Sequence, residues 1–407
     1  MTPETELLAR LEAELADGTR ARLETAVQRV VTAKQHGQKV AVVTGSGPNV
    51  HEGVTTLLAE LMRLGLVDGV TTSSAVVAHE MGGTLDRVKR CAGASLGIPQ
   101  HLLPRGGEFE LTLMSDEARR EIAQDLPLDL ELVDQLERAP GKTIIKAAGN
   151  LGYPMGLWLE QLAREILALA RAHCRTFEEV AGFGADPRTM IGRGARQGLP
   201  VLVTIPQLVG GGAVGLCLGD SISLLERANR LAHLLADAEV IIESGVALTQ
   251  EIHDGPFETY TGHGLWAGWQ DQFTFSLKGK SLIRIDLDPA LEQVWEMERG
   301  GGAVQRAIAD GMPKTKLFKV PFRMEMSGFA RHEGSLPLIG DLGVIWPLLA
   351  WKCAAALGLE LEFLSYPQQT APGQAMREAI VREVRPLSRA KMLENLRSSA
   401  AAGPARP

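Results

Sequence analysis

The sequence of 407 residues has few cysteines, few aromatic residues and no excess of positive charge. The four cysteines, Cys91, Cys174, Cys217 and Cys353, form no CxxC pair, which favours buried, reduced thiols over a disulfide framework. A net charge of −7 argues against a surface that coats nucleic acid or an anionic membrane. No apolar run approaches the ~20 residues that span a bilayer, and the acidic first helix lacks the pattern of a signal peptide. We therefore expect a cytoplasmic protein with no nucleic-acid or membrane partner.

A complete dinucleotide fingerprint is also missing, but a shorter glycine turn is present. The apolar run 39–44 predicts a strand that stops at Gly45-Ser46-Gly47-Pro48, and an amphipathic run predicts a helix over 51–65. Val50 stands where the third glycine of the fingerprint would be. A second strand over 66–70 completes a βαβ unit, whose strands are parallel. The turn either holds a phosphate or carboxylate or only joins a strand to a helix.

Strands and helices alternate again from about residue 187, with glycine-rich turns between them. This alternation predicts an α/β fold with a doubly wound, mostly parallel, Rossmann-like sheet. The expected parts are N-terminal helices (1–38), the first βαβ part of the core (39–91), a helical insertion or subdomain (92–185), the remainder of the core (186–360), and a C-terminal helix with a disordered tail (361–407).

Residues 243–269 hold the densest collection of acidic, histidine and aromatic side chains. Carboxylates together with aromatic faces suit an ammonium group. The histidine spacing is neither HxxxH nor HxH, so we expect no metal. The alternative is a polar surface loop with two half-buried tryptophans. We take the segment as a substrate site, with Glu251 and His253 as candidate catalytic residues and Glu243, Asp254, Glu258, Tyr260, His263, Trp266 and Trp269 as candidate substrate contacts.

Two further candidates lie at or beyond the ends of expected strands. His79-Glu80 follows the second strand, at the edge where open α/β sheets bind ligands. A histidine beside a carboxylate can move a substrate proton, although such pairs are also common on surface helices. Asp286 ends the strand 281–285, where a carboxylate can accept hydrogen bonds from ribose hydroxyls.

Four segments, in order, resemble the deoxyhypusine synthase-like superfamily: 45–80, 187–215, 239–255 and 281–349. The small-residue-Ala-His-acid sequence at 74–80 and Asp286-Leu287-Asp288-Pro289 look most like its LOR/SDH-type NAD-dependent ornithine cyclodeaminase branch. The resemblance covers about half of the chain. It implies bound NAD that is recycled: a hydride leaves the carbon of a C–N bond, the resulting imine reacts, and the hydride returns. It also implies a small amino acid or amine as substrate, and a homodimer or homotetramer.

The resemblance extends to individual residues. The glycine turn (Gly45, Ser46, Gly47 and Asn49) is similar to the first nucleotide-binding turn of the family, and Asp341 to its adenosine-side contact. Thr72, Ser73 and Ser74 match the second nucleotide loop, although Ser74 could simply cap a helix. Gly211 and Gly212 belong to a loop that replaces an acid-Gly sequence, so the backbone can approach the cofactor closely while the missing acid leaves the substrate open. Lys280 stands near the imine-forming lysine of the synthase, but its spacing to Asp286 differs.

The expectation is therefore an NAD-dependent lyase or aminoalkyl transferase, in which His79, Glu80 and Lys280 join the catalytic candidates. A non-redox lyase or transferase on the same fold is one alternative, because an acid of the family is missing at 210–212. A non-catalytic ligand-binding protein is the other. True deoxyhypusine synthesis is not expected, because neither a protein-lysine acceptor surface nor the aligned lysine is well supported.

Overall fold

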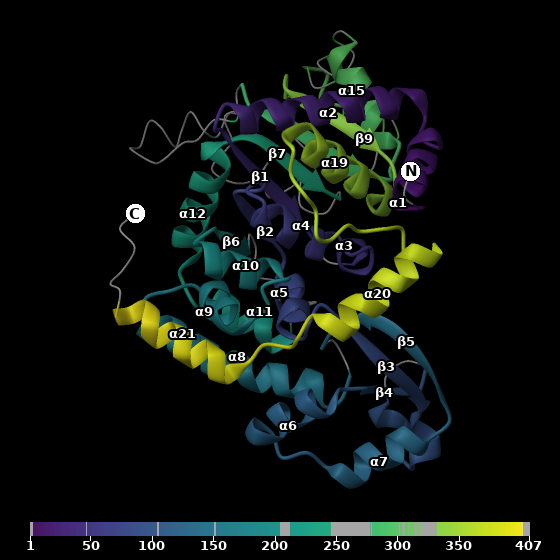
Figure 1. Cartoon of the computed structure of the whole chain (residues 1–407), viewed down its shortest axis with the longest axis vertical. Helices are drawn as coiled ribbons and strands as arrows, with labels where there is room; N and C mark the ends of the chain where they lie inside the picture. Colours follow the sequence, from purple (N-terminus) through teal and green to yellow (C-terminus); the bar gives the residue numbers. More distant parts are fainter. Residues whose placement is uncertain are drawn as a thin grey trace. The chain divides into compact units, whose positions relative to one another are not determined.

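The computed structural model divides into two compact units (Figure 1). Unit 1 comprises Met1–Thr72 and Leu224–Pro367, and unit 2 comprises Ser73–Ser223 and Gln368–Pro407. Within these units the structure describes residues 3–45, 47–103, 106–149, 152–203, 212–245, 277, 279–300, 302, 306, 307, 309–312, 316, 319 and 332–401. No helix among these residues is long and apolar enough to cross a membrane.

Unit 1 is built around parallel strands with helices on both faces. Its elements are α1 (Pro3–Ala13), α2 (Asp17–Gln35), β1 (Lys39–Thr44), α3 (Pro48–His51), α4 (Val54–Arg63), β2 (Gly69–Thr72), α12 (Leu224–Asp237), β7 (Ala238–Ser244), β8 (Ser281–Asp286), α15 (Ala290–Arg299), β9 (Ser335–Ile339) and α19 (Leu342–Leu357).

The strands of unit 1 lie in the order β2-β1-β7-β8-β9, and every neighbouring pair is parallel. On one face, residues of α2, α4 and α19 surround a small apolar gap together with Val40 and Ile242. On the other face, Leu231 of α12 and Leu291 of α15 share a core cluster with Ile241. Both faces of the sheet are therefore covered, which explains why its strands read as continuous apolar runs. The expected α/β class with a parallel sheet is confirmed.

The helix expected over 51–65 is two helices, and a glycine separates them. α3 ends at His51 and α4 begins at Val54. Between them Gly53 has φ +72° and ψ +11°, a left-handed conformation that glycine adopts at little steric cost. The amphipathic pattern carried no sign of this break, because the apolar positions on both sides of it are buried.

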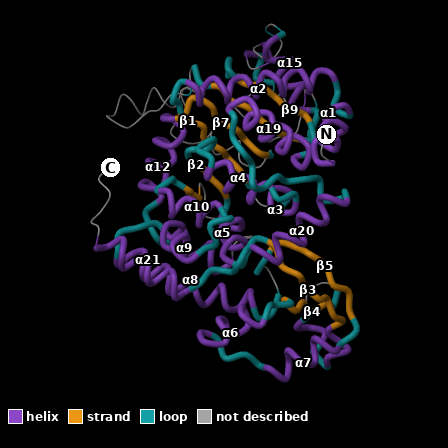
Figure 2. Tube along the Cα trace, viewed as in Figure 1, coloured by secondary structure: helices purple, strands orange, loops and turns teal. Residues whose placement is uncertain are grey.

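Unit 2 is mostly helical, with a small group of strands (Figure 2). Its elements are α5 (Ser74–Met81), β3 (Leu85–Ala92), the short 3-10 helices η1 (Gly93–Leu96) and η2 (Gln100–Leu102), β4 (Glu108–Thr112), α6 (Asp116–Asp125), α7 (Leu130–Arg138), β5 (Gly141–Ala147), α8 (Met155–Ala172), α9 (Phe177–Gly184), α10 (Met190–Gln197), β6 (Val201–Val203), α11 (Gly212–Gly219), α20 (Ala371–Glu383) and α21 (Arg389–Ala401).

Three strands of unit 2 form an antiparallel sheet in the order β4-β3-β5. Cys91, Leu111, Val133 and Leu136 make a core cluster between this sheet and α7. The expected insertion over 92–185 falls inside unit 2, which begins earlier and also includes the segment after residue 367. The sequence did not reveal β3, because its buried apolar residues Leu85, Val88 and Cys91 recur at every third position, which is not the alternation of a half-buried strand. The last residues of the expected disordered tail, 402–407, lie outside the described part.

Candidate functional site at the carboxyl edge of unit 1

The order of the strands reverses between β1 and β7. From β1 the chain moves through α3 and α4 to β2 on one side, whereas β7, β8 and β9 lie on the other side. Thr44 and Ser244, the last residues of these two central strands, are partners in the register. In open α/β sheets the ligand binds outside the carboxyl ends of the strands at such a reversal. This edge is therefore the candidate site.

A buried hydrogen-bond network fixes the two central strands and α19 at this edge. The indole Nε1–H of Trp346 donates to Ser244 Oγ at 2.8 Å. Ser244 Oγ donates in turn to Asn49 Oδ1, and Asn49 Nδ2 donates to the Ser244 carbonyl oxygen at 3.3 Å. All three residues are buried. Because α3, β7 and α19 each supply a member, the turn after β1 is held against the end of β7. The expected cofactor residue Asn49 thus positions the turn.

Two buried hydroxyl groups at the same edge have no hydrogen-bond partner among the described residues. Thr44 ends β1 and Thr72 ends β2, and both side chains are at most 1% exposed. Each lies one residue beyond the registered pair Val43 and Thr71, so the two hydroxyl groups belong to neighbouring strand ends. Neither Oγ1 is satisfied by the described part of the chain. A buried polar atom left in that state costs about 1–3 kcal/mol, and a ligand with polar groups would remove this cost.

The turns that follow β1 and β7 contain glycines in conformations that other residues rarely adopt. Gly47 has φ +63° and ψ −116°, and Gly245 has φ +96°. A Cβ on either residue would meet no atom within 4 Å, so the backbone conformation, not crowding, requires glycine. Gly45 is half-buried, and Ser46 lies outside the described residues.

Charged side chains gather on the neighbouring strand ends. Arg284 of β8 is fully buried, with its Nε 3.8 Å from Glu243 Oε2 and its Nη2 3.9 Å from Asp286 Oδ2. Asp286 Oδ1 accepts a hydrogen bond from the amide of Asp288 at 3.0 Å. Glu243 was expected to contact substrate, but it is 0% exposed and faces Arg284 within the sheet. Asp286 lies at the carboxyl edge, as expected.

Asp341 and Lys280 lie at opposite edges of the sheet. Asp341 caps α19 by accepting from the amide of Gly343 at 2.9 Å, and it follows β9, the neighbour of β8. The amide of Gly340 donates to the Asp286 carbonyl oxygen at 2.8 Å, so Asp286 and Asp341 share the carboxyl edge. Lys280 precedes β8, at the amino edge, about 20 Å along the strand from Asp286. The structure does not bring Lys280 to the candidate site.

In unit 2, His79 and Glu80 point to different partners. His79 Nδ1 is 2.8 Å from the Ala148 carbonyl oxygen, which can only accept, so Nδ1 carries the proton and Nε2 holds the lone pair. Burial lowers the pKa of His79, although the bond to Ala148 opposes this shift. The ring is therefore neutral at pH 7, with its orientation fixed.

Glu80 holds the start of α10. Its Oε1 and Oε2 accept from the amides of Met190 and Ile191 at 2.9 and 3.0 Å. Burial raises the pKa of Glu80 to about 7, and the two amide hydrogen bonds oppose the rise. Both carboxylate oxygens are thus engaged by backbone, a structural role that the adjacent placement of the two residues in sequence does not indicate.

Of the remaining expected site residues, some lie in the described part of the structure and the others lie outside it. Ser73, not Ser74, caps α5, since its Oγ accepts from the amide of Val76 at 3.4 Å. Ser74 is the buried first residue of that helix. Gly212 begins α11, and a Cβ there would lie 3.1 Å from Glu160 Oε1. Outside the described residues lie Ser46, Gly211, Glu251, His253, Asp254, Glu258, Tyr260, His263, Trp266 and Trp269.

Sequence reasoning missed four residues of the edge: Thr44, Ser244, Arg284 and Trp346. Arg284 could have been found, because an arginine inside the apolar strand sequence SLIRI calls for a buried acidic neighbour. Thr44 and Ser244 carry no such signal, since a hydroxyl at a strand end is common. Trp346 is separated from Ser244 by about a hundred residues of sequence and meets it only through the fold.

No family model matches this chain, and no curated protein matches it. Solved structures do. The arginine dihydrolase ArgZ, from the ornithine-ammonia cycle in cyanobacteria, is 12% identical with a TM-score of 0.40, over 84% of this chain and 32% of ArgZ. AgrE in a ternary complex with ornithine and NAD+ is 14% identical with a TM-score of 0.41, over 84% of this chain and 34% of AgrE.

A conserved LOR/SDH protein from Methanococcus maripaludis S2 is 11% identical with a TM-score of 0.40, over 85% of this chain and 70% of that protein. This chain spans about a third of the length of ArgZ and AgrE. Likenesses of this size support no statement about what this chain binds or does.

Proposed function

We propose that this protein is an NAD-dependent enzyme of amino acid or amine metabolism, which binds its dinucleotide at the carboxyl edge of unit 1. One observation carries the proposal. The strand order reverses between β1 and β7, and at this reversal two buried hydroxyl groups, Thr44 and Thr72, lack a partner among the described residues. The sequence resemblance supplies the identity of the dinucleotide and the substrate class.

The residues of the edge fit a dinucleotide in chemical terms. The turn at Gly47 leaves open space and has no side chain to obstruct a pyrophosphate. Thr44 and Thr72 would bond polar groups of the cofactor. Asp286 ends β8, where a carboxylate can accept from ribose hydroxyls. Asn49, Ser244 and Trp346 would keep the edge in place, since their hydrogen bonds are made within the protein.

NAD, when bound, would accept a hydride from the carbon that carries the amino group and return it later in the cycle. We assign proton transfer to His79 because of the tautomer and the protonation state of its imidazole ring. The bond from Nδ1 to Ala148 fixes the tautomer, and the lowered pKa keeps Nε2 unprotonated at pH 7. The ring is thus in the form that a general base requires. Glu80 is not assigned a proton, because its oxygens hold α10.

Binding of NAD to the purified protein tests the proposal directly. Native mass spectrometry would detect NAD that copurifies and would show whether the subunits form the expected homodimer or homotetramer. Isothermal titration with NAD then measures the affinity of the protein after the nucleotide has been removed. Turnover of an amino acid or amine without any NAD binding would favour a non-redox lyase or transferase and would overturn the redox proposal.

A pair of glycine variants locates the binding. Gly47→Ala places a Cβ at the proposed site, whereas Gly37→Ala makes the same change after α2, where Gly37 has φ +70° and equally open surroundings. Both variants strain the backbone at positive φ and are expected to lose stability. Only Gly47→Ala should weaken NAD binding, by about tenfold or more. Equal affinities for the two variants would exclude this edge as the site.

A further inference from the structure

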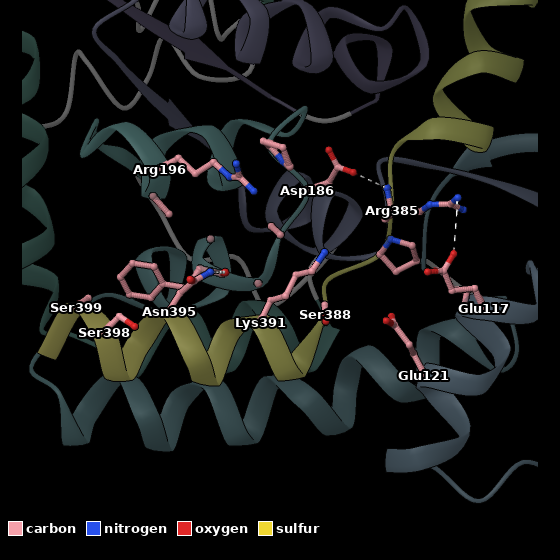
Figure 3. A pocket seen from close by; sticks show the side chains of 18 of the residues that line it. Glu117, Glu121, Asp186, Arg196, Arg385, Ser388, Lys391, Asn395, Ser398 and Ser399 are labelled. Carbon is pink, nitrogen blue, oxygen red and sulfur yellow. Dashed lines mark hydrogen bonds and ion pairs between the residues drawn. The ribbon is translucent and has the colours of Figure 1, made fainter. Parts of the chain in front are cut away.

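Unit 2 contains a cavity of about 650 Å³, which none of the candidate cofactor-binding or catalytic residues lines (Figure 3). Its walls come from α6, the connection between α9 and α10, the end of α10, the connection between α20 and α21, and α21 itself. The volume is in the range of small-molecule sites. We propose that this cavity binds a small dipolar metabolite of net charge −1, with its anionic groups on Arg196 and Lys391 and its ammonium group on Glu121.

Hydrogen bonds between chain segments far apart in sequence fix the walls. Asp186 is buried, and its Oδ2 accepts from the amide of Arg385 at 3.0 Å. The amide of Ser388 donates to the Gly184 carbonyl oxygen at 2.9 Å, and Asn395 Nδ2 donates to the Phe183 carbonyl oxygen at 2.8 Å. The loop before α10 is thereby tied to the loop before α21 and to α21 itself.

Close packing strengthens this connection. A Cβ on Gly184 would lie 2.6 Å from the Ser388 carbonyl oxygen and 2.8 Å from Met392 Cβ, so only glycine lets α21 approach this closely. Arg389, in the first turn of α21, makes two hydrogen bonds of 2.7 Å to Glu165 of α8. The cavity is therefore formed before a ligand arrives, which lowers the entropic cost of binding.

The charged groups that line the cavity divide into paired and unpaired ones. Arg385 Nη2 is 3.8 Å from Glu117, and Asp186 is bonded to backbone amides and to Arg188. Among the described residues, Arg196 and Lys391 have no acidic partner, and Glu121 has no basic one. In Figure 3 the ends of Arg196, from α10, and Lys391, from α21, point into the hollow, with Glu121 on the α6 wall.

This distribution selects the class of ligand. A ligand with two anionic groups and one ammonium group, and therefore a net charge of −1, would match the two unpaired cations and the one unpaired carboxylate that line the cavity. A guanidinium group binds a carboxylate through two parallel hydrogen bonds, and a lysine ammonium adds a point charge. A carboxylate opposite them favours a ligand that also carries an ammonium group. An acidic amino acid has this combination of charges.

One face of α21 forms part of the cavity wall. Lys391, Asn395, Ser398 and Ser399 line it and follow helical spacing. Arg397 lies on the same helix but does not line the cavity, and it is exposed. Arg397 is therefore a control for the removal of charge from α21 without any change to the cavity.

Isothermal titration of the full chain with L-glutamate, glutarate and L-lysine tests the proposal. L-Glutamate should bind more tightly than glutarate, which lacks the ammonium group, and L-lysine should bind weakest, because its net charge is positive. The double variant Arg196→Gln/Lys391→Gln should lose at least tenfold in affinity for L-glutamate. Glu121→Gln should remove the preference for L-glutamate over glutarate.

The double variant Arg397→Gln/Lys142→Gln, which removes the same charge from exposed positions outside the cavity, should bind L-glutamate as the unmodified protein does. If both double variants lost the same affinity for L-glutamate, the loss would come from the change in net charge and not from the cavity, and the proposal would be overturned. No detectable binding of L-glutamate would also overturn it. Neither result bears on NAD binding by unit 1, so the two proposals fail independently.

Discussion

Thr44→Val tests the carboxyl edge of unit 1 by replacing one hydroxyl group with a methyl group of nearly the same shape. The side chain is 0% exposed, and its Oγ1 has no partner among the described residues. In the protein without ligand this hydroxyl lowers the free energy of unfolding, because folding removes its hydrogen bonds to water and replaces them with none. The substitution should therefore raise the free energy of unfolding of unit 1 by about 1 kcal/mol. With NAD the sign reverses, because the hydroxyl would be bonded to the cofactor.

The two effects give measurements with opposite signs. A gain of about 1 kcal/mol corresponds to a rise in Tm of roughly 2–4 °C for a unit of this size. Loss of one hydrogen bond to the cofactor should weaken NAD binding by about tenfold. Differential scanning calorimetry without NAD measures the first quantity, and isothermal titration measures the second. Thr72→Val should behave in the same way, since its hydroxyl is buried at the adjacent strand end.

Thr56→Val is the matched control for this prediction. Thr56 is also buried, and its Oγ1 has no partner among the described residues, but it lies on α4 and not at a strand end. It should gain stability and keep its affinity for NAD. The reasoning is refuted if Thr44→Val lowers stability, because the hydroxyl then has an internal partner. It is refuted equally if stability rises while the affinity for NAD stays unchanged.

Three further predictions concern single interactions. Trp346→Phe removes the hydrogen bond to Ser244 and should lower the free energy of unfolding by about 1 kcal/mol, measured by urea denaturation. Burial raises the pKa values of Glu80 and Asp86 to about 7, above their unfolded values, so stability should fall as pH rises from about 4.5 to 7. Urea denaturation at several pH values should show about half of that slope for Glu80→Gln, and an unchanged slope would contradict the assignment. Nitrogen-15 NMR should find His79 with its proton on Nδ1 and a pKa below 6.5.

The parallel sheet could be predicted from sequence because its strands are buried on both faces. The expected strand 39–44 coincides with β1, and the expected 281–285 is β8 without its last residue. The antiparallel sheet of unit 2 lies largely in a region that the sequence indicated only as a helical insertion or subdomain. Its strands β5 (GKTIIKA) and β3 (LDRVKRCA) mix charged with apolar residues and give no continuous apolar run. Full burial on two faces leaves a signal in composition that partial burial does not.

The candidate site was harder to predict, because its residues gain their roles from partners distant in sequence. Glu80 follows His79 directly, which suggested a shared chemical role, but the helix turns the two side chains toward different segments. Glu243 was grouped with an acidic segment, yet the register of β7 with β8 buries it beside Arg284. Pairings of this kind depend on strand order, which residue spacing within one segment does not encode.

The carboxyl edge of unit 1 holds two buried hydroxyl groups at neighbouring strand ends. β1 runs through buried apolar residues from Val40 to Val43, and β1 and β2 each end in a threonine whose hydroxyl has no partner among the described residues. Each of these unpartnered hydroxyl groups costs stability by itself. Their occurrence on one edge, at the point where the strand order reverses, is better explained by a ligand than by independent accidents of packing, since functional sites are where sequences depart from local rules.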